Sequence, residues 1–203
     1  ELLPNPVPSS LEASGQQFAS DQRQPEVLAL ARLQPQKGLD LLLRAFALLL
    51  PSSRKGWRLT LVGEGPEGTA LKQLCAELGI DDVVSFEGFR SDTKTFLRRA
   101  SIFALPSRFE GMPNALLEAM ASGLPSVVSD ASPGPLEMVH DGVEGFVVPS
   151  ENVEALARAL ERLIQDPALR ERCGASARTK LASMDWSVLE PCWRSVLALP
   201  KEE

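Results

Sequence analysis

The chain has 203 residues, of which 44% are hydrophobic, and it carries a formal net charge of −6. A chain of this length can bury a substantial core as one large domain or two small ones, and we favour one. The acidic balance argues against nucleic acid or an anionic membrane surface as the main partner, because both repel an acidic protein.

The cysteines predict neither a disulfide framework nor a metal site. Cys75, Cys173 and Cys192 are odd in number and form no C-x-x-C pair, and His140 is the single histidine. We therefore expect a reducing, cytoplasmic environment and no bound metal or cofactor. No apolar run reaches the roughly 18 to 20 residues of a membrane span, and no signal peptide opens the chain. Because the chain begins with "ELLPNPVP" rather than Met, we expect a piece of a longer protein.

After a polar N-terminal stretch, short apolar runs alternate with longer helical patterns. Strands are predicted at 27–31, 58–62, 83–86, 101–105, 125–129 and 145–149. Helices are predicted at 38–50, 66–78, 92–99 and 113–122, with a short turn at 135–139, and then at 151–165, 167–182 and 185–198. Near-continuous apolar strands are typical of a parallel sheet covered on both faces. The sequence therefore predicts a doubly wound α/β domain with a six-stranded, mostly parallel, Rossmann-like sheet and extra C-terminal helices.

Three parts of the chain are distinguished by these patterns. Residues 1–25 read as a linker, residues 26–184 as the α/β domain, and residues 185–203 as a C-terminal helix. In an open parallel sheet, ligands bind outside the carboxyl ends of the strands. The residues just after each strand are therefore the candidates for function.

Two cations follow the first predicted strand, in "ARLQPQKG". Arg32 ends the strand and Lys37 precedes the next helix, so both could converge on one phosphate group. The alternative is that both are solvated surface charges, as most Lys and Arg side chains are.

The second strand is followed by "VGEGPEG", where Gly63, Gly65 and Gly68 match the spacing of a dinucleotide-binding loop. Pro66 and Glu67 place a rigid ring and a negative charge where a pyrophosphate would lie. A structural interpretation is at least as good: the glycines allow a sharp turn, and Pro66 takes the first helical position.

The fourth strand leads into "RFEGMPNALLEAMASG". Pro113 suits the first helical position, which makes Met112 the N-cap, and Met has no side-chain acceptor for the first amides. Gly111 allows close backbone approach, so Gly111 to Asn114 could hold an anion.

Two acids flank this helix start. Glu118 lies about 7 to 8 Å along the axis from Pro113, an offset that suits a carboxylate holding the ribose diol of a nucleotide whose phosphates sit at the helix end. Glu110 would then face a sugar at the other end of the diphosphate. The alternatives are an acid favoured by the helix dipole for Glu110 and a solvated side chain for Glu118.

In order, "ARLQPQKG", "LVGEGP" and "EGMPNALLEAMASGLPSVVSD" resemble the C-terminal, nucleotide-sugar-binding domain of family 4 retaining glycosyltransferases of the GT-B fold. The segment "GPLEMVHDGVEGFVVP" fits the same family pattern through Glu137, Asp141, Gly142 and Gly145. The resemblance covers about residues 26 to 198.

The resemblance implies a role for each candidate residue. Arg32 and Lys37 would bind the donor diphosphate and stabilise it as leaving group, and Glu110 would contact the transferred sugar. The nucleotide would be held by the following residues: Gly63 at a loop near the donor, Phe89 and Arg90 near the base, Gly111, Met112, Pro113 and Asn114 through backbone groups, and Glu118 at the ribose. The chain has no D-x-D pair, which agrees with the metal-independent chemistry of the fold class.

The resemblance also implies partners outside this chain. The family's N-terminal acceptor-binding domain is missing, so we expect the isolated chain to bind a donor, with UDP-sugars favoured on family frequency, but to transfer nothing. A glycan or lipid-linked acceptor would bind through the missing domain, and the full protein could associate peripherally with a membrane. The apolar face of residues 185–198 would lack its partner and could drive self-association.

Ser132, Pro133 and Gly134 replace the family's commoner Gly-Gly pair. Two rival functions stay open at this point. One is a dinucleotide-dependent oxidoreductase built on "GEGPEG", and the other is a non-catalytic sugar-nucleotide-binding module.

Overall fold

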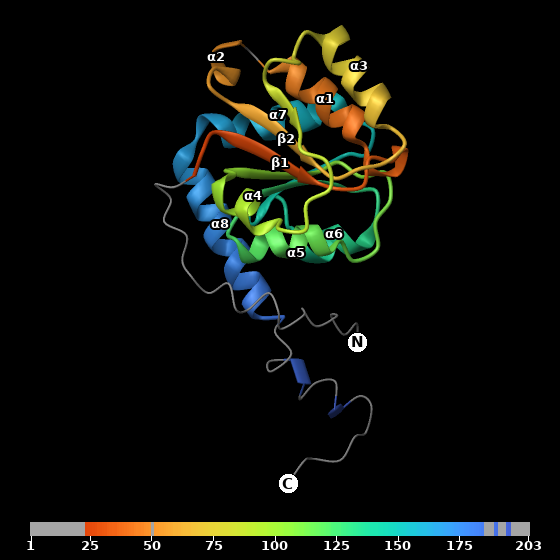
Figure 1. Cartoon of the computed structure of the whole chain (residues 1–203). Coiled ribbons are helices and arrows are strands. Elements are labelled where there is room, and N and C mark those ends of the chain that lie inside the picture. Colours follow the sequence, from red (N-terminus) through yellow and green to blue (C-terminus); the bar gives the residue numbers. More distant parts are fainter. Residues whose placement is uncertain (1–22, 50, 185–188, 191–193, 196–203) are drawn as a thin grey trace.

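A computed structural model describes residues 23–49, 51–184, 189–190 and 194–195, and it contains a six-stranded sheet (Figure 1). The strands are β1 (Glu26–Leu30), β2 (Arg58–Val62), β3 (Val84–Phe86), β4 (Ile102–Leu105), β5 (Ser126–Ser129) and β6 (Gly145–Val148). Their order is β3-β2-β1-β4-β5-β6, and every neighbouring pair is parallel. The predicted doubly wound α/β fold is confirmed, and the sheet is parallel throughout.

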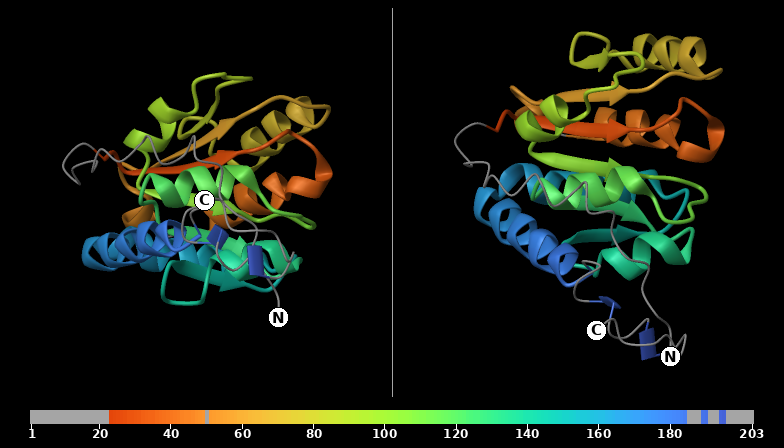
Figure 2. Two further views of the ribbon diagram at one scale, coloured as in Figure 1. Left: turned by 90° about the horizontal axis from the view of Figure 1, so that it is seen from below. Right: turned by 60° about the horizontal axis from the view of Figure 1, so that its bottom comes forward.

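Helices cover both faces of this sheet (Figures 1 and 2). One layer contains α1 (Leu39–Leu48), α3 (Gly68–Leu78) and α7 (Val153–Gln165), and the other contains α4 (Lys94–Arg99), α5 (Asn114–Ala121) and α6 (Pro133–Met138). A short helix, α2 (Pro51–Arg54), lies against α7. Burial on both faces explains why the central strands are apolar at nearly every position.

The long helix α8 (Pro167–Ala182) joins the two cores. Its buried side chains recur every four residues, from Leu169 and Cys173 to Ala177 and Leu181. The first two belong to the core on the α1 side and the last two to the core on the α5 side. Asp166 caps the helix by accepting a hydrogen bond from the amide of Leu169 at 2.9 Å. The helix thus closes the β6 edge of the domain.

Some element boundaries differ from the predicted ones. The α3 helix begins at Gly68 and not at Pro66, because the amide of Glu67 donates to the carbonyl of Leu33 (3.0 Å) and so belongs to a turn. The helix predicted at 38–50 ends at Leu48, and α2 follows as a separate turn. The predicted short turn near 135–139 is helix α6, which begins at Pro133.

Most of the C-terminal segment predicted as a helix at 185–198 lies outside the described residues, including Asp185, Trp186 and Trp193. Leu189 is described, and its side chain is buried against the core on the α5 side. Self-association through this segment stays a prediction.

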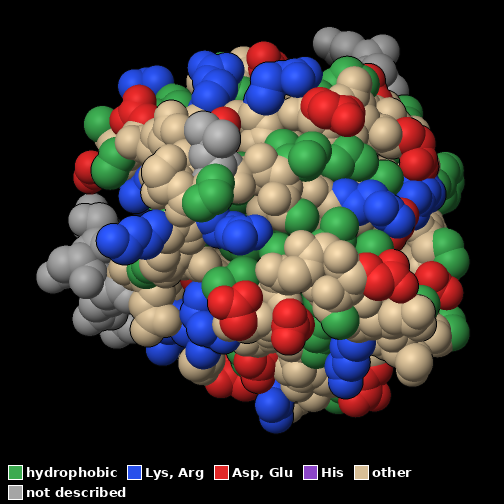
Figure 3. Space-filling model, turned by 90° about the horizontal axis from the view of Figure 1, so that it is seen from above, with side chains coloured by type: hydrophobic (Ala, Val, Ile, Leu, Met, Phe, Trp, Pro, Cys, Tyr) green, Lys and Arg blue, Asp and Glu red, His purple; other side chains and the backbone are tan. Residues whose placement is uncertain are grey.

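The surface seen from above in the view of Figure 1 carries mixed charge (Figure 3). Blue and red side chains are interspersed there, and hydrophobic side chains are scattered among them. A nucleic acid or an anionic membrane binds most strongly to a continuous basic surface, and this face offers none.

The exit loops of β1 and β2 approach each other closely at Gly63. Its φ is +139°, and a Cβ there would lie 2.0 Å from the carbonyl oxygen of Ala31. The next glycine, Gly65, has the same relation to Leu33, whose carbonyl would meet a Cβ at 2.3 Å. The glycines of "GEGPEG" therefore serve close backbone packing, as the structural interpretation of this motif predicts.

Gly63→Ala should destabilise the fold strongly, because it adds both backbone strain and a clash with Ala31. We expect a loss of about 2 to 5 kcal/mol in the free energy of unfolding. Gly56→Ala is the matched control, since its φ is +80° but a Cβ would meet nothing within 4 Å, and it should cost about 1 to 2 kcal/mol. Urea denaturation of both variants measures the difference, and equal losses would contradict the role of the close approach.

Candidate functional site

The exits of all six strands lie along one edge of the sheet, because the strands are parallel (Figure 2). The candidate residues belong to the loops after β1, β2, β3 and β4 and to the first turns of α5. The edge is therefore where the predicted site must be assembled.

Lys37 and Glu110 meet directly at this edge. The Lys37 Nζ donates to Glu110 Oε1 at 2.7 Å, and the two side chains are only 16% and 8% exposed. Lys37 ends the 3₁₀ helix η3 (Pro35–Lys37) after β1, and Glu110 belongs to the loop after β4. An ion pair this secluded from water is stronger than a surface pair. Neither residue is the solvated charge of the alternative interpretation.

Serine hydroxyls fix Glu110 from two sides. Ser107 Oγ donates to Glu110 Oε1 at 2.7 Å, and the backbone amide of Glu110 donates to Ser132 Oγ at 2.8 Å. Ser129 in turn donates its hydroxyl to the carbonyl of Ser107. All three serines are buried. The sequence analysis did not assign them, although hydroxyls directly after buried strands are a signal that could have been used.

The turn that carries Lys37 sits tightly against the β4 exit. Gly38 follows it with φ +62°, and a Cβ at Gly38 would lie 2.1 Å from the carbonyl oxygen of Pro106. Only glycine fits there. Lys37 is consequently held near Glu110 by the backbone as well as by its own charge.

Arg32, the other predicted cation, is exposed, and its guanidinium has no hydrogen bond or ion pair with the described residues. It leaves β1 at the same edge as Lys37. An uncommitted cation at the strand exits is available for an anionic ligand.

The start of α5 differs by one residue from the predicted one. Pro113 is the N-cap, with extended backbone (φ −80°, ψ 103°), and the amides of Leu116 and Leu117 both donate to its carbonyl. The prediction of Met112 as N-cap is therefore wrong, because proline fixes φ but leaves ψ free to end the helix. No side chain caps this helix, so the amides of Asn114 and Ala115 are left for an outside acceptor.

Gly111 stands open in front of this helix start. It is exposed, and a Cβ there would meet nothing within 4 Å. Behind it, Gly134 of α6 packs so closely that a Cβ would lie 1.7 Å from the carbonyl oxygen of Gly111. The backbone at Gly111 is therefore supported from behind and accessible from the front.

Glu118 is half-buried in α5 and is not a freely solvated side chain. Its Oε2 accepts a hydrogen bond of 3.0 Å from Thr93 Oγ1, in the connection between β3 and α4. The contact joins the carboxylate predicted to hold the ribose to the loop predicted to lie near the base. Sequence spacing did not indicate this partner.

The loop after β3 borders a groove of about 620 Å³. The groove lies between this loop and the start of α3 and is lined by residues that include Gly63, Lys72, Phe86 and Gly88. Phe89 is 72% exposed, while Arg90 pairs with Glu87 at 3.4 Å across the surface.

Comparison with known proteins identifies the family. The model for glycosyl transferases group 1 matches residues 12–180. The chain belongs to this family. It is 39% identical over 197 residues to a D-inositol 3-phosphate glycosyltransferase of Streptomyces griseus, covering 92% of this chain and 41% of that protein. It is also 37% identical over 166 residues to an exopolysaccharide phosphotransferase of Streptomyces coelicolor, covering 81% and 18%.

A solved structure agrees with this assignment. HepE from Anabaena, in complex with UDP, superposes with a TM-score of 0.77 at 26% identity, over 95% of this chain and 53% of that one. The group 1 chain described here thus forms one Rossmann-like half of a GT-B glycosyltransferase fold. It spans less than half the length of the curated relatives named above.

Two further properties of this glycosyltransferase domain concern metals and membranes. Among the described residues, no group of three or more His, Cys, Asp or Glu side chains is arranged to hold a metal ion. Within the same residues, no helix is both long and apolar enough to cross a bilayer.

Arg108 is a residue of the site edge that the sequence analysis missed. Its guanidinium makes two bonds to Asp40, Nη1 to Oδ1 at 2.8 Å and Nη2 to Oδ2 at 2.9 Å. Partial burial alone would raise the pKa of Asp40, but the hydrogen bonds and charge of Arg108 outweigh it and hold that pKa below its ordinary value. Its position two residues before Glu110 was the available signal.

The stability that Asp40 contributes should depend on pH. Because its pKa is lower in the folded state, the unfolded chain binds more protons as pH falls toward the folded pKa, so the contribution is present above about pH 4 and is lost below it. Asp40→Asn should therefore cost about 0.5 to 1 kcal/mol at pH 7 and less at pH 3. Urea denaturation of both proteins at each pH tests this, and a gap that grows in acid would contradict it.

Proposed function

We propose that the chain is the donor-binding half of a retaining glycosyltransferase and binds a nucleotide diphosphate sugar, with a UDP-sugar favoured. The observation that carries the proposal is the secluded Lys37–Glu110 pair beside an uncapped helix start. A diphosphate needs cations and free amides, and the transferred sugar needs a fixed carboxylate within the same few ångströms. The UDP bound to HepE supports the choice of nucleotide.

Arg32 and Lys37 would neutralise the diphosphate. Lys37 has three donors, so it can keep Glu110 Oε1 and still donate to a phosphate oxygen. Arg32 has no partner among the described residues and would turn its fork to the same group. The two cations would do the electrostatic work for which other transferases use a divalent ion.

Glu110 would contact the sugar, and Glu118 the ribose. The amides of Gly111, Met112 and Asn114 would face the phosphates, and Pro113 would leave the helix start open because it has no N–H. The base would lie near Phe89 and Arg90, beside the groove that Gly63 borders.

In the complete enzyme the reaction would run with retention. The bond between the sugar C1 and the phosphate oxygen breaks, and a bond from C1 to the acceptor oxygen forms on the same face. The acceptor proton passes to the departing phosphate oxygen. Relatives act, by their names, on D-inositol 3-phosphate or on the lipopolysaccharide core, so we expect a glycan or lipid-linked acceptor.

A dinucleotide-dependent oxidoreductase is the less favoured function. Its fingerprint needs glycines that approach a pyrophosphate, but Gly63 and Gly65 approach Ala31 and Leu33 instead. A non-catalytic donor-binding module shares the site described here and differs only in the fate of the donor.

The two acids should respond differently to two ligands. Glu118→Ala should weaken UDP itself, because UDP retains the ribose diol, whereas Glu110→Ala should leave UDP nearly unchanged and weaken only UDP-glucose. The affected complex should lose about 1.5 to 3 kcal/mol. Calorimetry with both ligands separates the roles, and the reverse pattern would overturn the assignment.

The chain alone should bind the donor without transferring sugar, because the acceptor is proposed to bind the half that this chain lacks. An assay with radiolabelled UDP-glucose and a mixture of acceptors should show no product above background. Chelation with EDTA should leave UDP binding unchanged. Robust transfer by the chain alone would show that its active site is complete.

A further inference from the structure

Arg108 connects the two loops that supply Lys37 and Glu110. Its backbone amide donates to the carbonyl of Gln36 at 2.8 Å, and its Nη1 donates to the carbonyl of Pro35 at 2.6 Å. In return, Gln36 Nε2 donates to the carbonyl of Phe109 at 2.9 Å. Three hydrogen bonds therefore fasten η3, which ends in Lys37, to the chain just before Glu110.

The same guanidinium reaches two further elements. It holds Asp40 at the start of α1, as described above, and its Nε donates to Glu151 Oε1 at 2.5 Å. Glu151 lies after β6 and has φ +61°, the one positive φ at a non-glycine residue in the described chain. Such a conformation costs energy and persists where its surroundings enforce it. Arg108 thus ties the exits of β1, β4 and β6 together.

We propose that Arg108 is a positioning residue for donor binding, which keeps Lys37 beside Glu110 and acts on the diphosphate through Lys37. The inference rests on the proposed function. Lys37 is flanked by bonds that Arg108 makes, to Pro35 and Gln36 before it and to Asp40 after it. Without them, η3 is held to the β4 exit only by the bond from Gln36 and by packing at Gly38.

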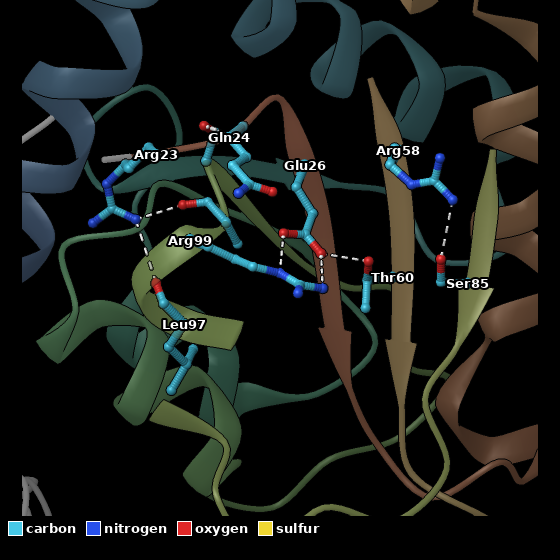
Figure 4. A network of polar contacts seen from close by, with 10 residues as sticks. Arg23, Gln24, Glu26, Arg58, Thr60, Ser85, Leu97 and Arg99 are labelled. Carbon is cyan, nitrogen blue, oxygen red and sulfur yellow. Dashed lines mark hydrogen bonds and ion pairs between the residues drawn. The ribbon is translucent and has the colours of Figure 1, made fainter. Parts of the chain in front are cut away.

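A merely structural role is the alternative, and the chain contains a matched ion pair for it. Arg99 binds Glu26 through Nε at 2.8 Å and Nη2 at 2.9 Å, and Thr60 donates to the same carboxylate (Figure 4). This pair lies at the amino ends of the strands, away from the proposed site, because Glu26 opens β1 and Arg99 precedes β4. Arg99→Ala therefore removes a comparable two-bond pair without touching the strand exits.

The test is a double-mutant cycle on UDP binding by this chain, measured by calorimetry with uridine as the second ligand. Arg108→Ala should weaken UDP about tenfold, a typical coupling within one network, and should leave uridine unchanged because uridine has no diphosphate. Lys37→Ala should weaken UDP at least as much. In the Lys37→Ala background, Arg108→Ala should change UDP affinity by less than about twofold, because the residue it positions is gone.

Arg99→Ala should lower the midpoint of thermal unfolding while UDP affinity stays within about twofold of the unchanged chain. If Arg108→Ala does not fold, Arg108→Lys keeps the charge but loses the fork and should reproduce the UDP loss and its dependence on Lys37. Additive losses of Arg108 and Lys37, or an equal loss of UDP and uridine, would overturn the positioning role alone. Failure of the unchanged chain to bind UDP, GDP or ADP would overturn the proposed function together with this inference.

Discussion

Parallel pairing of all six strands is the constraint on which the site depends. It sends every strand exit to one edge of the sheet, so that residues distant in sequence become neighbours. Lys37 and Glu110 are 73 positions apart and meet at 2.7 Å. The strand order places β4 beside β1, although two strands intervene in the chain. The loops after these two adjacent strands supply the cation and the carboxylate of one ion pair.

The pair also reconciles an acidic chain with an anionic ligand. The net charge of −6 gives no general attraction for a diphosphate, and a carboxylate at the site would repel it. Lys37 offsets the charge of Glu110 at the point of contact, and Arg32 adds a cation that no described residue engages. The local balance at the strand exits is therefore positive, even though the whole molecule is acidic.

The fold and the location of the site could be predicted because both follow from periodicity. Apolar runs located all six strands, and their exits located Lys37 and Glu110. The contacts themselves could not be predicted, because spacing places a residue on an element and does not say which side chains meet. Arg108 looked like one more surface arginine, and its five side-chain bonds depend on three loops that only the folded sheet assembles.

Small shifts of element boundaries had a similar origin. Proline at position 113 suits either the first helical residue or the N-cap, and the choice depends on ψ, which the sequence does not fix. The turn at Pro66 is set by a bond to Leu33 in another loop, so local preference alone placed the start of α3 two residues too early.

The bond between Thr93 and Glu118 bears on how a nucleotide could be held. Thr93 uses one acceptor position of the carboxylate, and a carboxylate offers about four. Enough capacity remains for two ribose hydroxyls, so the bond orients Glu118 without occupying it. It also links α5 to the connection between β3 and α4, where Phe89 and Arg90 lie. The parts of the proposed site that would meet the base and the ribose are therefore held to each other before any ligand arrives, which reduces the ordering cost of binding.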